Sequence, residues 1–262
     1  METMSGQIKV PAKVNLSLEI TGVREGFHTL KMETMAVDLF DVVHFEKNDG
    51  NKIQIEFGAT FDGFEENRFR PIIDKAVTKF VEAYGEVGAR LVIDKNIPLG
   101  AGLGGSSSAV VGVIKALEKL KNTKVDARFL LSLGSDLPVV YNGGHNLVTG
   151  IGEQVEPLKF EEKHFVILVG GAVDSKEAYT LYDKIGTEKY GKRENHLEKS
   201  ARQLNENVKI ERELLEKAGA EDIVMSGSGS AVVAVFDRAD KAKSVFEKVD
   251  GMSKYLAKSI EN

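Results

Sequence analysis

The sequence predicts an α+β fold, in which strands and helices follow one another in mixed order. Residues 14–20 alternate strictly between apolar and polar side chains, so their four apolar side chains are expected on one face of a half-buried strand. Residues 110–120 instead place apolar side chains three or four positions apart, as in a helix that packs on a core. The two patterns do not alternate in regular strand–helix–strand units, which favours α+β over a doubly wound parallel sheet.

The first half of the chain is expected to contain several strands and helices. Pro71 is suited to the start of a helix that continues to Tyr84. A second helix is expected from Ser107 onward, and Asp126 is suited to cap a short helix that ends at Leu133. Alternation and turn residues predict strands at residues 14–20, 42–46, 53–57 and 90–94.

The second half begins again with an apolar strand at residues 165–169 and continues with helical patterns. Gly219 is suited to end the last helix of that group. A glycine-rich turn then joins two strands within residues 225–236. Helices are expected at residues 175–183, 195–204, 207–218 and 242–249, with a final strand at 254–260.

The length of 262 residues allows two modest domains, and the change of pattern places a boundary near residue 155. We therefore expect one domain over residues 1–155 and another over residues 156–262. Hydrophobic residues make up 42% and charged residues 29% of the chain, which suits an ordinary folded core. The net charge of −5 is spread along the chain, so a dedicated nucleic-acid binder is not expected.

Several classes of protein and site are excluded or disfavoured by composition. The chain has no cysteine, which excludes disulfides, thiolate catalysis and cysteine-based zinc sites. Its five histidines never occur as His-Glu-x-x-His, so a zinc hydrolase is not expected. The first six residues lack the basic start and apolar stretch of a secretion signal, and no apolar run approaches ~18 residues. We expect a cytoplasmic protein with no membrane partner.

The segment Pro98-Leu-Gly-Ala-Gly-Leu-Gly-Gly-Ser-Ser-Ser108 is the strongest functional signal in the chain. Its four glycines lack Cβ atoms, so several backbone N–H groups can converge on an anion. Its three serines open a helix whose N-terminal N–H groups and dipole favour phosphate. The segment predicts a phosphate-binding loop; the alternative is a flexible surface loop.

A dinucleotide site is a second interpretation of this loop. Gly100, Gly102 and Gly105 fit the dinucleotide-binding spacing, and Asp126 lies about where a ribose-binding acid is expected. However, Lys95-Asn-Ile-Pro98 separates the glycines from the preceding strand, and Asp126 precedes a helix instead of ending a strand. Gly-Lys-Ser/Thr is also missing, so the loop is not of the Walker type. A nicotinamide-dependent oxidoreductase stays the less favoured alternative.

Three motifs, in order, resemble those of the GHMP kinases, which include galactokinase, homoserine kinase and mevalonate kinase. They are Pro11-Ala-Lys-Val-Asn-Leu16, the loop preceded by Lys95-Asn-Ile-Pro98, and Met225-Ser-Gly-Ser-Gly-Ser230. The resemblance implies a two-domain α+β GHMP kinase fold, with an S5-like N-terminal nucleotide domain and a ferredoxin-like C-terminal α/β sandwich. It also implies that ATP and substrate bind in the cleft between the domains.

Further motifs resemble the branch of this superfamily that phosphorylates a cytidyl diphosphate sugar alcohol in isoprenoid precursor synthesis. They are Gly26-Phe-His-Thr-Leu30, Gly134-Ser-Asp-Leu-Pro138, Val173-Asp-Ser-Lys-Glu-Ala-Tyr179 and Asn195-His-Leu-Glu198. The resemblance implies an ATP-dependent kinase with Mg²⁺ accompanying the ATP, no nucleic-acid partner, and a monomer or homodimer.

The chain departs from that branch at three positions. Ser106 replaces a glycine of the phosphate loop, Ala109 an aspartate, and His196 the aspartate of the Asn-Asp-Leu-Glu motif. Alanine at position 109 is typical of mevalonate and homoserine kinases, so a kinase of that type is one alternative. A nucleotide-binding relative that has lost catalysis is another.

The resemblance also implies a role for each site residue. Asp136 would be the catalytic base and Lys13 its partner, since a carboxylate can accept the hydroxyl proton while an ammonium group keeps the carboxylate ionised. Taken alone, Asp136 is better explained as a turn or helix-cap residue before Pro138, and Lys13 as a solvated strand residue; their joint placement in two family motifs reverses this. Phe27 and Tyr179 would sandwich a cytosine ring, and His28 would bond to its edge.

The remaining implied contacts divide between substrate and nucleotide, and the metal ligands are not assigned. The substrate would also touch Asn15, Ser226 and Gly227, although Ser226-Gly-Ser-Gly229 could be an ordinary tight turn. The residues expected to bind ATP are Lys95, Pro98, Leu99, Gly100, Ala101, Gly102, Leu103, Gly104, Gly105, Ser106, Ser107 and Ser108.

Overall fold

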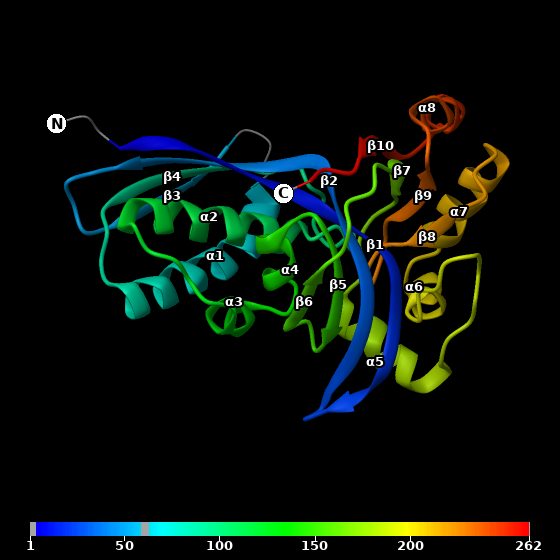
Figure 1. Cartoon of the computed structure of the whole chain (residues 1–262), viewed down its shortest axis with the longest axis horizontal. Coiled ribbons are helices and arrows are strands. Elements are labelled where there is room, and N and C mark those ends of the chain that lie inside the picture. Colours follow the sequence, from blue (N-terminus) through cyan, green and yellow to red (C-terminus); the bar gives the residue numbers. More distant parts are fainter. Residues whose placement is uncertain (1–3, 59–62, 262) are drawn as a thin grey trace.

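The computed structural model describes residues 4–58 and 63–261 and contains two β-sheets with helices packed against them (Figure 1). The first sheet has the order β3-β4-β2-β5-β6, and β1 pairs with β2. The second sheet has the order β10-β7-β9-β8. This arrangement confirms the predicted α+β class.

The strands of the first sheet are β1 (Ser5–Arg24), β2 (Phe27–Lys47), β3 (Ile53–Phe57), β4 (Ala89–Asp94), β5 (His145–Gly150) and β6 (Gln154–Pro157). Those of the second are β7 (His164–Val169), β8 (Ile223–Met225), β9 (Val232–Phe236) and β10 (Ser253–Lys258). The helices are α1 (Gly63–Tyr84), α2 (Gly105–Lys121), α3 (Ala127–Leu133), α4 (Leu137–Asn142), α5 (Ser175–Ile185), α6 (Glu198–Leu204), α7 (Asn207–Lys217) and α8 (Ala239–Lys248).

The chain passes from the first sheet to the second between Pro157 and His164, close to the expected boundary near residue 155. Its end returns to the first sheet, because Val37 and Ser259 form a β-bridge and the Ile260 N–H donates to the Ala36 carbonyl at 3.1 Å. A buried apolar cluster also contains residues of both sheets, among them Met35 of β2. The division into two domains stays a prediction.

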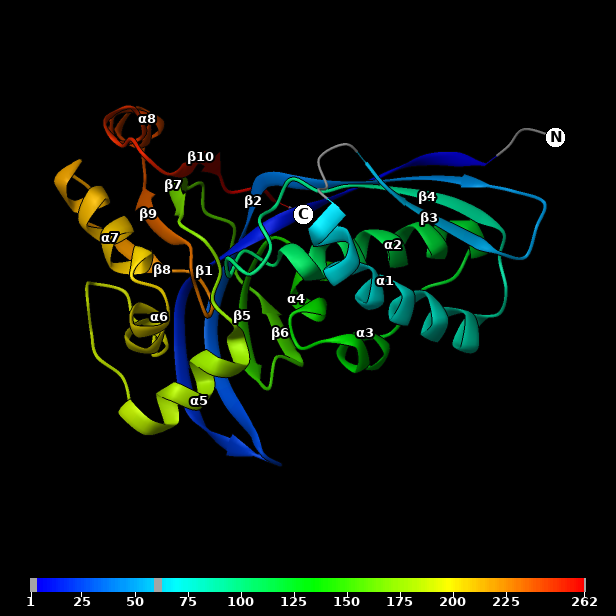
Figure 2. The same cartoon turned by 180° about the vertical axis from the view of Figure 1, so that it is seen from behind.

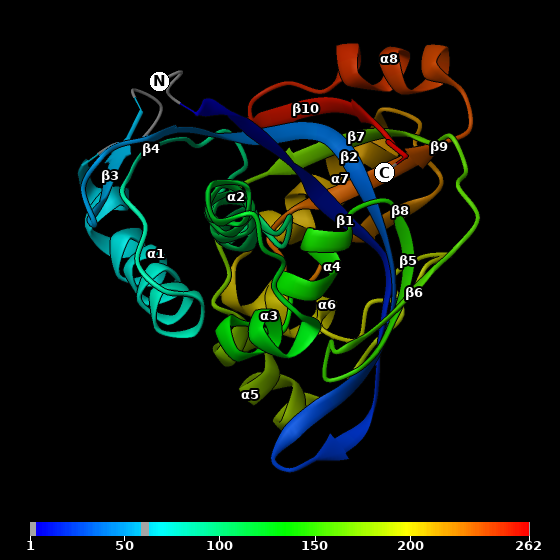
Figure 3. The same ribbon diagram turned by 60° about the vertical axis from the view of Figure 1, so that its left-hand side comes forward.

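A long hairpin of β1 and β2 forms one wall of the site and extends away from the rest of the molecule (Figure 3). Asn15 pairs with Thr34 and Ser17 with Glu33, so Leu16 is an extra residue that forms a β-bulge. The expectation that the apolar residues of 14–20 share one face is therefore wrong. Val14 and Leu16 lie in one buried cluster, whereas Leu18 lies in the other. Beyond the bulge the alternation is reversed, and Leu18 comes to the same face as Lys13.

Two helix predictions need correction at their starts. The helix expected from Pro71 begins at Gly63, and Pro71 lies inside it. The buried Phe69 anchors this N-terminal extension to the core. The helix expected from residue 195 begins at Glu198, because the Asn195 side chain bonds to the Leu197 N–H and to two carbonyls of another segment.

The segment between Asp136 and Leu158 contains elements that the sequence patterns did not predict. They are the short helix α4 and the hairpin of β5 and β6. In the described part of the chain, no helix is long and apolar enough to cross a lipid bilayer.

Glu211 of α7 is a buried acid whose two carboxylate oxygens have no hydrogen-bond partner among the described residues. Burial raises its pKa from 4.5 to about 8, and the nearby backbone of Gly170 and Val232 offsets this only in part. The folded state therefore binds the proton more tightly than the unfolded chain does. The contribution of Glu211 to the free energy of unfolding is therefore fully present below pH 4.5. It is lost as the pH rises through about 8.

We therefore expect the Glu211→Gln variant to lose less stability than the parent when the pH is raised. The free energy of unfolding of the parent should fall between pH 5 and 9 by on the order of 3–5 kcal/mol more than that of the variant. Denaturant unfolding of both proteins at the two pH values measures this difference. Glu213→Gln, at a more exposed position of the same helix, is the control, and equal pH slopes for parent and Glu211→Gln would contradict the assignment.

Candidate active site

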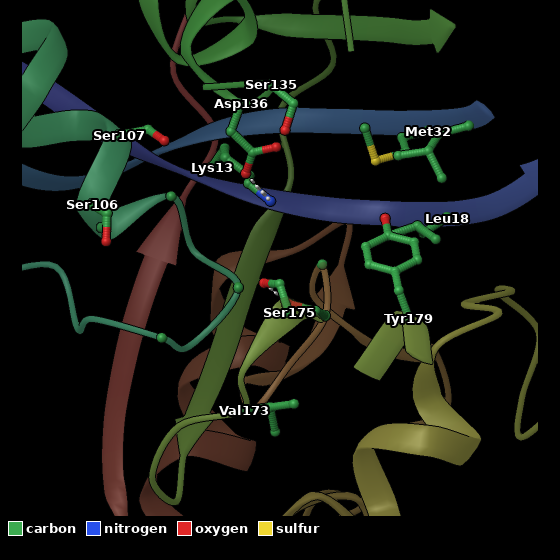
Figure 4. Close-up of a pocket in the computed structure, with 17 residues that line it drawn as sticks. Lys13, Leu18, Met32, Ser106, Ser107, Ser135, Asp136, Val173, Ser175 and Tyr179 are labelled. Atoms are coloured by element: carbon green, nitrogen blue, oxygen red, sulfur yellow. Dashed lines mark hydrogen bonds and ion pairs between the residues drawn. The ribbon is translucent and has the colours of Figure 1, made fainter. Parts of the chain in front are cut away.

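A cleft of about 240 Å³ opens where the glycine loop, the β1–β2 hairpin and α5 meet (Figure 4). Helix α5 lies beside the hairpin in the views from both sides (Figures 1 and 2). Of the residues predicted for the site, ten line this cleft. They are Lys13, Gly100, Gly102, Gly104, Gly105, Ser106, Ser107, Asp136, Tyr179 and Gly227.

An ion pair between Lys13 and Asp136 lies in the cleft, with 3.6 Å between the lysine Nζ and the carboxylate Oδ2. The lysine side chain is 8% exposed and the aspartate side chain 42% exposed. Asp136 occupies the N-cap position of α4, but its carboxylate makes no cap hydrogen bond. The side chain is therefore available to a ligand in the cleft instead of capping the start of α4.

A chain of hydrogen bonds connects three motifs that lie far apart in the sequence. The Lys13 ammonium donates to the Asn15 side-chain oxygen, and the Asn15 N–H donates to the Ser226 hydroxyl at 3.0 Å. That hydroxyl donates to the Gly102 carbonyl at 2.9 Å. Asn15 and Ser226 are buried below the cleft and do not line it. Their position suits them to hold the lysine and the glycine loop in register.

Close approach of two loops explains the glycine at position 102. Its φ is +74°, and an added Cβ would lie 2.0 Å from the Ser226 carbonyl oxygen. A side chain would separate the glycine loop from the turn that contains Ser226 and Gly227.

Helix α2 presents an uncapped N-terminus to the cleft. It begins at Gly105, and Gly104 at the N-cap position has a φ of 77° and offers no side-chain cap. Ser106 and Ser107 of the first turn line the cleft. The free N–H groups and the helix dipole favour an anion at this point, and both hydroxyls can add hydrogen bonds.

The two ends of the glycine loop are held by Asp41 of β2, whose side chain is completely buried. One carboxylate oxygen accepts the N–H groups of Asn96 and Ile97 at 2.8 and 2.9 Å. The other accepts from the Lys95 ammonium at 2.6 Å and from the Ser108 hydroxyl. A single carboxylate thus joins the residues before the loop to the helix after it.

This network changes the expected roles of two residues. Lys95 is 4% exposed at its side chain and lies outside the cleft, and the Ser108 side chain is fully buried. The structure therefore gives both side chains a position in a buried network and not one facing the cleft. Pro98 and Leu99 line a separate hollow together with Lys95, while Ala101 and Leu103 are buried in the core.

The residues expected to hold an aromatic ring are only partly brought together. His28, and not Phe27, stacks on Tyr179, with ring centroids 5.0 Å apart and planes 20° apart. The Nε2 atom of His28 lies 2.8 Å from a carboxylate oxygen of Asp183. Phe27 is 64% exposed beside the hairpin turn. Burial raises the pKa of Tyr179, so its hydroxyl stays protonated and can donate a hydrogen bond.

Seven lining residues were not among the predicted site residues: Leu18, Leu30, Met32, Ser135, Val173, Ser175 and Ser228. Five of these, all except Leu18 and Met32, lie within the quoted motifs, so the motifs already contained a signal for them. Ser175 and Ser228 contact each other through their hydroxyls at 2.7 Å and join α5 to the second glycine turn. Leu18 of β1 could be placed in the cleft only with knowledge of the bulge at Leu16.

Magnesium would find few protein ligands here. Among the residues that the structure describes, no group of three or more His, Cys, Asp or Glu side chains could hold a metal ion. Asp136 supplies a carboxylate to the cleft, and the hydroxyl oxygens of Ser106 and Ser107 nearby could also act as metal ligands. This set fits an ion that is held mainly by substrate phosphates and water, as is usual for Mg²⁺.

Comparison with known proteins adds two family matches and a group of relatives. Residues 71–151 match the GHMP kinases N terminal domain, and residues 184–253 match the GHMP kinases C terminal. A 4-diphosphocytidyl-2-C-methyl-D-erythritol kinase of Clostridium beijerinckii is 35% identical over 68% of this chain and 65% of its own length. One from Prochlorococcus marinus is 37% identical over 70% of this chain and 61% of its own length.

Solved structures share the fold over nearly the whole chain. A 4-(cytidine 5'-diphospho)-2C-methyl-D-erythritol kinase superposes with a TM-score of 0.73 at 24% identity, covering 98% of this chain and 100% of the other. The mevalonate kinase of Methanococcus jannaschii gives a TM-score of 0.72 at 16% identity, covering 98% and 99%. The predicted fold is confirmed by these similarities.

Proposed function

This chain belongs to the GHMP kinases, and we propose that it transfers the γ-phosphoryl group of ATP to the 2-hydroxyl of 4-diphosphocytidyl-2-C-methyl-D-erythritol. Such a reaction is a step in non-mevalonate isoprenoid precursor synthesis. The observation that carries the proposal is the Lys13–Asp136 pair, which lies in one cleft with the uncapped N-terminus of α2.

The proposed chemistry follows from the positions of these groups. The acceptor hydroxyl oxygen forms a bond to the γ-phosphorus while the bond from that phosphorus to the β-phosphate oxygen breaks and ADP leaves. Asp136 accepts the hydroxyl proton, and Lys13 stabilises the charge that develops on the acceptor oxygen. The N–H groups at the start of α2 hold the phosphates. Bound magnesium would neutralise part of the phosphate charge.

The choice of a cytidyl acceptor is supported by the relatives and by the end of the cleft at Tyr179. A cytosine ring needs flat aromatic faces and a hydrogen-bonding partner at its edge. Tyr179 supplies a face in the cleft, and the exposed Phe27 lies beside the turn of the neighbouring hairpin. His28 is held by Asp183 through Nε2, which leaves Nδ1 for the edge of the base.

Of the three departures from the relatives' motifs, Ser106 lines the cleft, whereas Ala109 and His196 do not. Ala109 is completely buried in the core, so a larger or charged residue there would not face the substrate. His196 accepts the Ile20 N–H through Nδ1 at 3.0 Å, which ties the segment before α6 to the hairpin.

A product assay with ATP and three acceptors tests the proposal. We expect the purified chain to phosphorylate 4-diphosphocytidyl-2-C-methyl-D-erythritol at least ~10²-fold faster, as kcat/KM, than mevalonate or homoserine, because those acceptors leave the aromatic end of the cleft unfilled. Mass spectrometry of the products and release of ADP measure the rates. Activity only on mevalonate or homoserine would contradict the proposed acceptor. Binding of NAD(P) without ATP would overturn the kinase assignment.

A further inference from the structure

The cleft continues past Asp136 into a second hollow of about 440 Å³. The two hollows share Ser106, Ser107, Ser135 and Asp136, so they meet at the first turn of α2 and at the proposed base. The second hollow is lined on its other side by residues of α1, among them Pro71, Ile72 and Lys75. Helix α1 packs against α2 (Figure 2). The second hollow therefore adjoins the position proposed for the transferred phosphate, on the side away from Tyr179.

The charged residues around this combined space are few. Within the described part of the chain, the charged side chains that line the two hollows are Lys13, Lys75 and Asp136. Lys13 is paired with Asp136 and bonded to Asn15, so their charges largely cancel. A triphosphate brings several negative charges into this space. Lys75 is then the cation that can pair with them.

Lys75 is also free to make such a contact. It lies on the α1 wall of the second hollow and, among the described residues, forms no ion pair or hydrogen bond. Lys79, one turn further along α1, differs because its ammonium donates to the Ser132 carbonyl at 3.0 Å and to the Ser132 hydroxyl. A lysine side chain is a flexible point charge that can reach a phosphate from the edge of its pocket.

We propose that Lys75 binds the triphosphate of ATP from the α1 side, opposite the N-terminus of α2. This inference rests on the proposed kinase function and adds to it a nucleotide-binding residue outside the glycine loop. It gives the triphosphate one contact that depends on the charge of a side chain, in addition to the backbone N–H groups of the loop.

The test is nucleotide binding, measured by calorimetry with a non-hydrolysable ATP analogue, ADP and AMP, without any acceptor. Lys75→Met should weaken binding of the ATP analogue about tenfold or more while changing AMP binding little, since a charge-assisted phosphate contact is lost. Lys75→Arg should keep most of the affinity. Lys79→Met is the matched control and should bind all three nucleotides as the parent does.

The outcomes separate this inference from the proposed function. If the parent binds no ATP analogue, the kinase assignment fails. If the parent binds it and Lys75→Met binds it equally well, or loses AMP affinity to the same extent, only the role of Lys75 is overturned. Lys75 is exposed, so the variant should fold, and a thermal melt close to that of the parent checks this.

Discussion

Replacing Asp136 with asparagine is expected to lower kcat by about 10²–10⁴-fold while leaving the fold and ATP binding in place. Asparagine has the same shape but cannot accept the proton of the acceptor hydroxyl. The carboxylate makes no cap hydrogen bond in α4, so the thermal midpoint should change little. Steady-state assays with the cytidyl acceptor, together with ATP-analogue binding, measure the two effects separately.

Asp126→Asn provides the matched control for this variant. Asp126 caps α3 by accepting the Phe129 N–H at 2.7 Å, and asparagine can make the same bond. Its activity should equal that of the parent. Unchanged phosphoryl transfer in Asp136→Asn would show that the assigned mechanism is wrong, even though the fold is right.

The second large effect is expected from Asp41→Asn. The completely buried Asp41 carboxylate pairs with Lys95 and holds both ends of the glycine loop, so its neutral analogue removes the negative charge that faces the buried Lys95 ammonium. Loss of one partner of a buried ion pair costs about 3–5 kcal/mol. Denaturant unfolding measures this loss. ATP binding should also weaken, because the loop is no longer fixed at Asn96, Ile97 and Ser108.

Two further variants test whether the loss of stability comes from the buried position and the charge of Asp41. Glu56→Gln breaks an exposed pair with Arg90 on neighbouring strands and should have a far smaller effect on stability. The double variant Asp41→Asn/Lys95→Met removes the buried ammonium group as well and should recover part of the stability lost in Asp41→Asn. A loss no greater for Asp41→Asn than for Glu56→Gln would contradict the role of Asp41.

Local motifs predicted the centre of the site well. The glycine loop has an unusual composition, and Lys13 and Asp136 lie in short motifs that resemble those of the family; the structure brings all three to one cleft. Local periodicity also predicted most of the strands and helices. Short motifs can predict such a loop because its phosphate-binding backbone conformation depends on consecutive residues of the sequence.

The remaining parts depend on contacts between distant segments. Asp41 is one aspartate in a long strand, and nothing beside it indicates that its partners are Lys95 and Ser108. Lys75 is one of two lysines on α1, and only the packing of α1 on α2 places it at the site. The position of His28 against Tyr179 likewise depends on how α5 meets the hairpin.

The bulge at Leu16 has a consequence for protein engineering. Lys13 and Leu18 are an odd number of residues apart, so a regular strand would turn them to opposite faces. The extra residue brings both into the cleft, together with Met32 of the partner strand. The length of this segment therefore matters more than the identity of Leu16. Apolar substitutions there change only packing, whereas a deletion would move each later side chain of the strand to the opposite face and turn Leu18 out of the cleft.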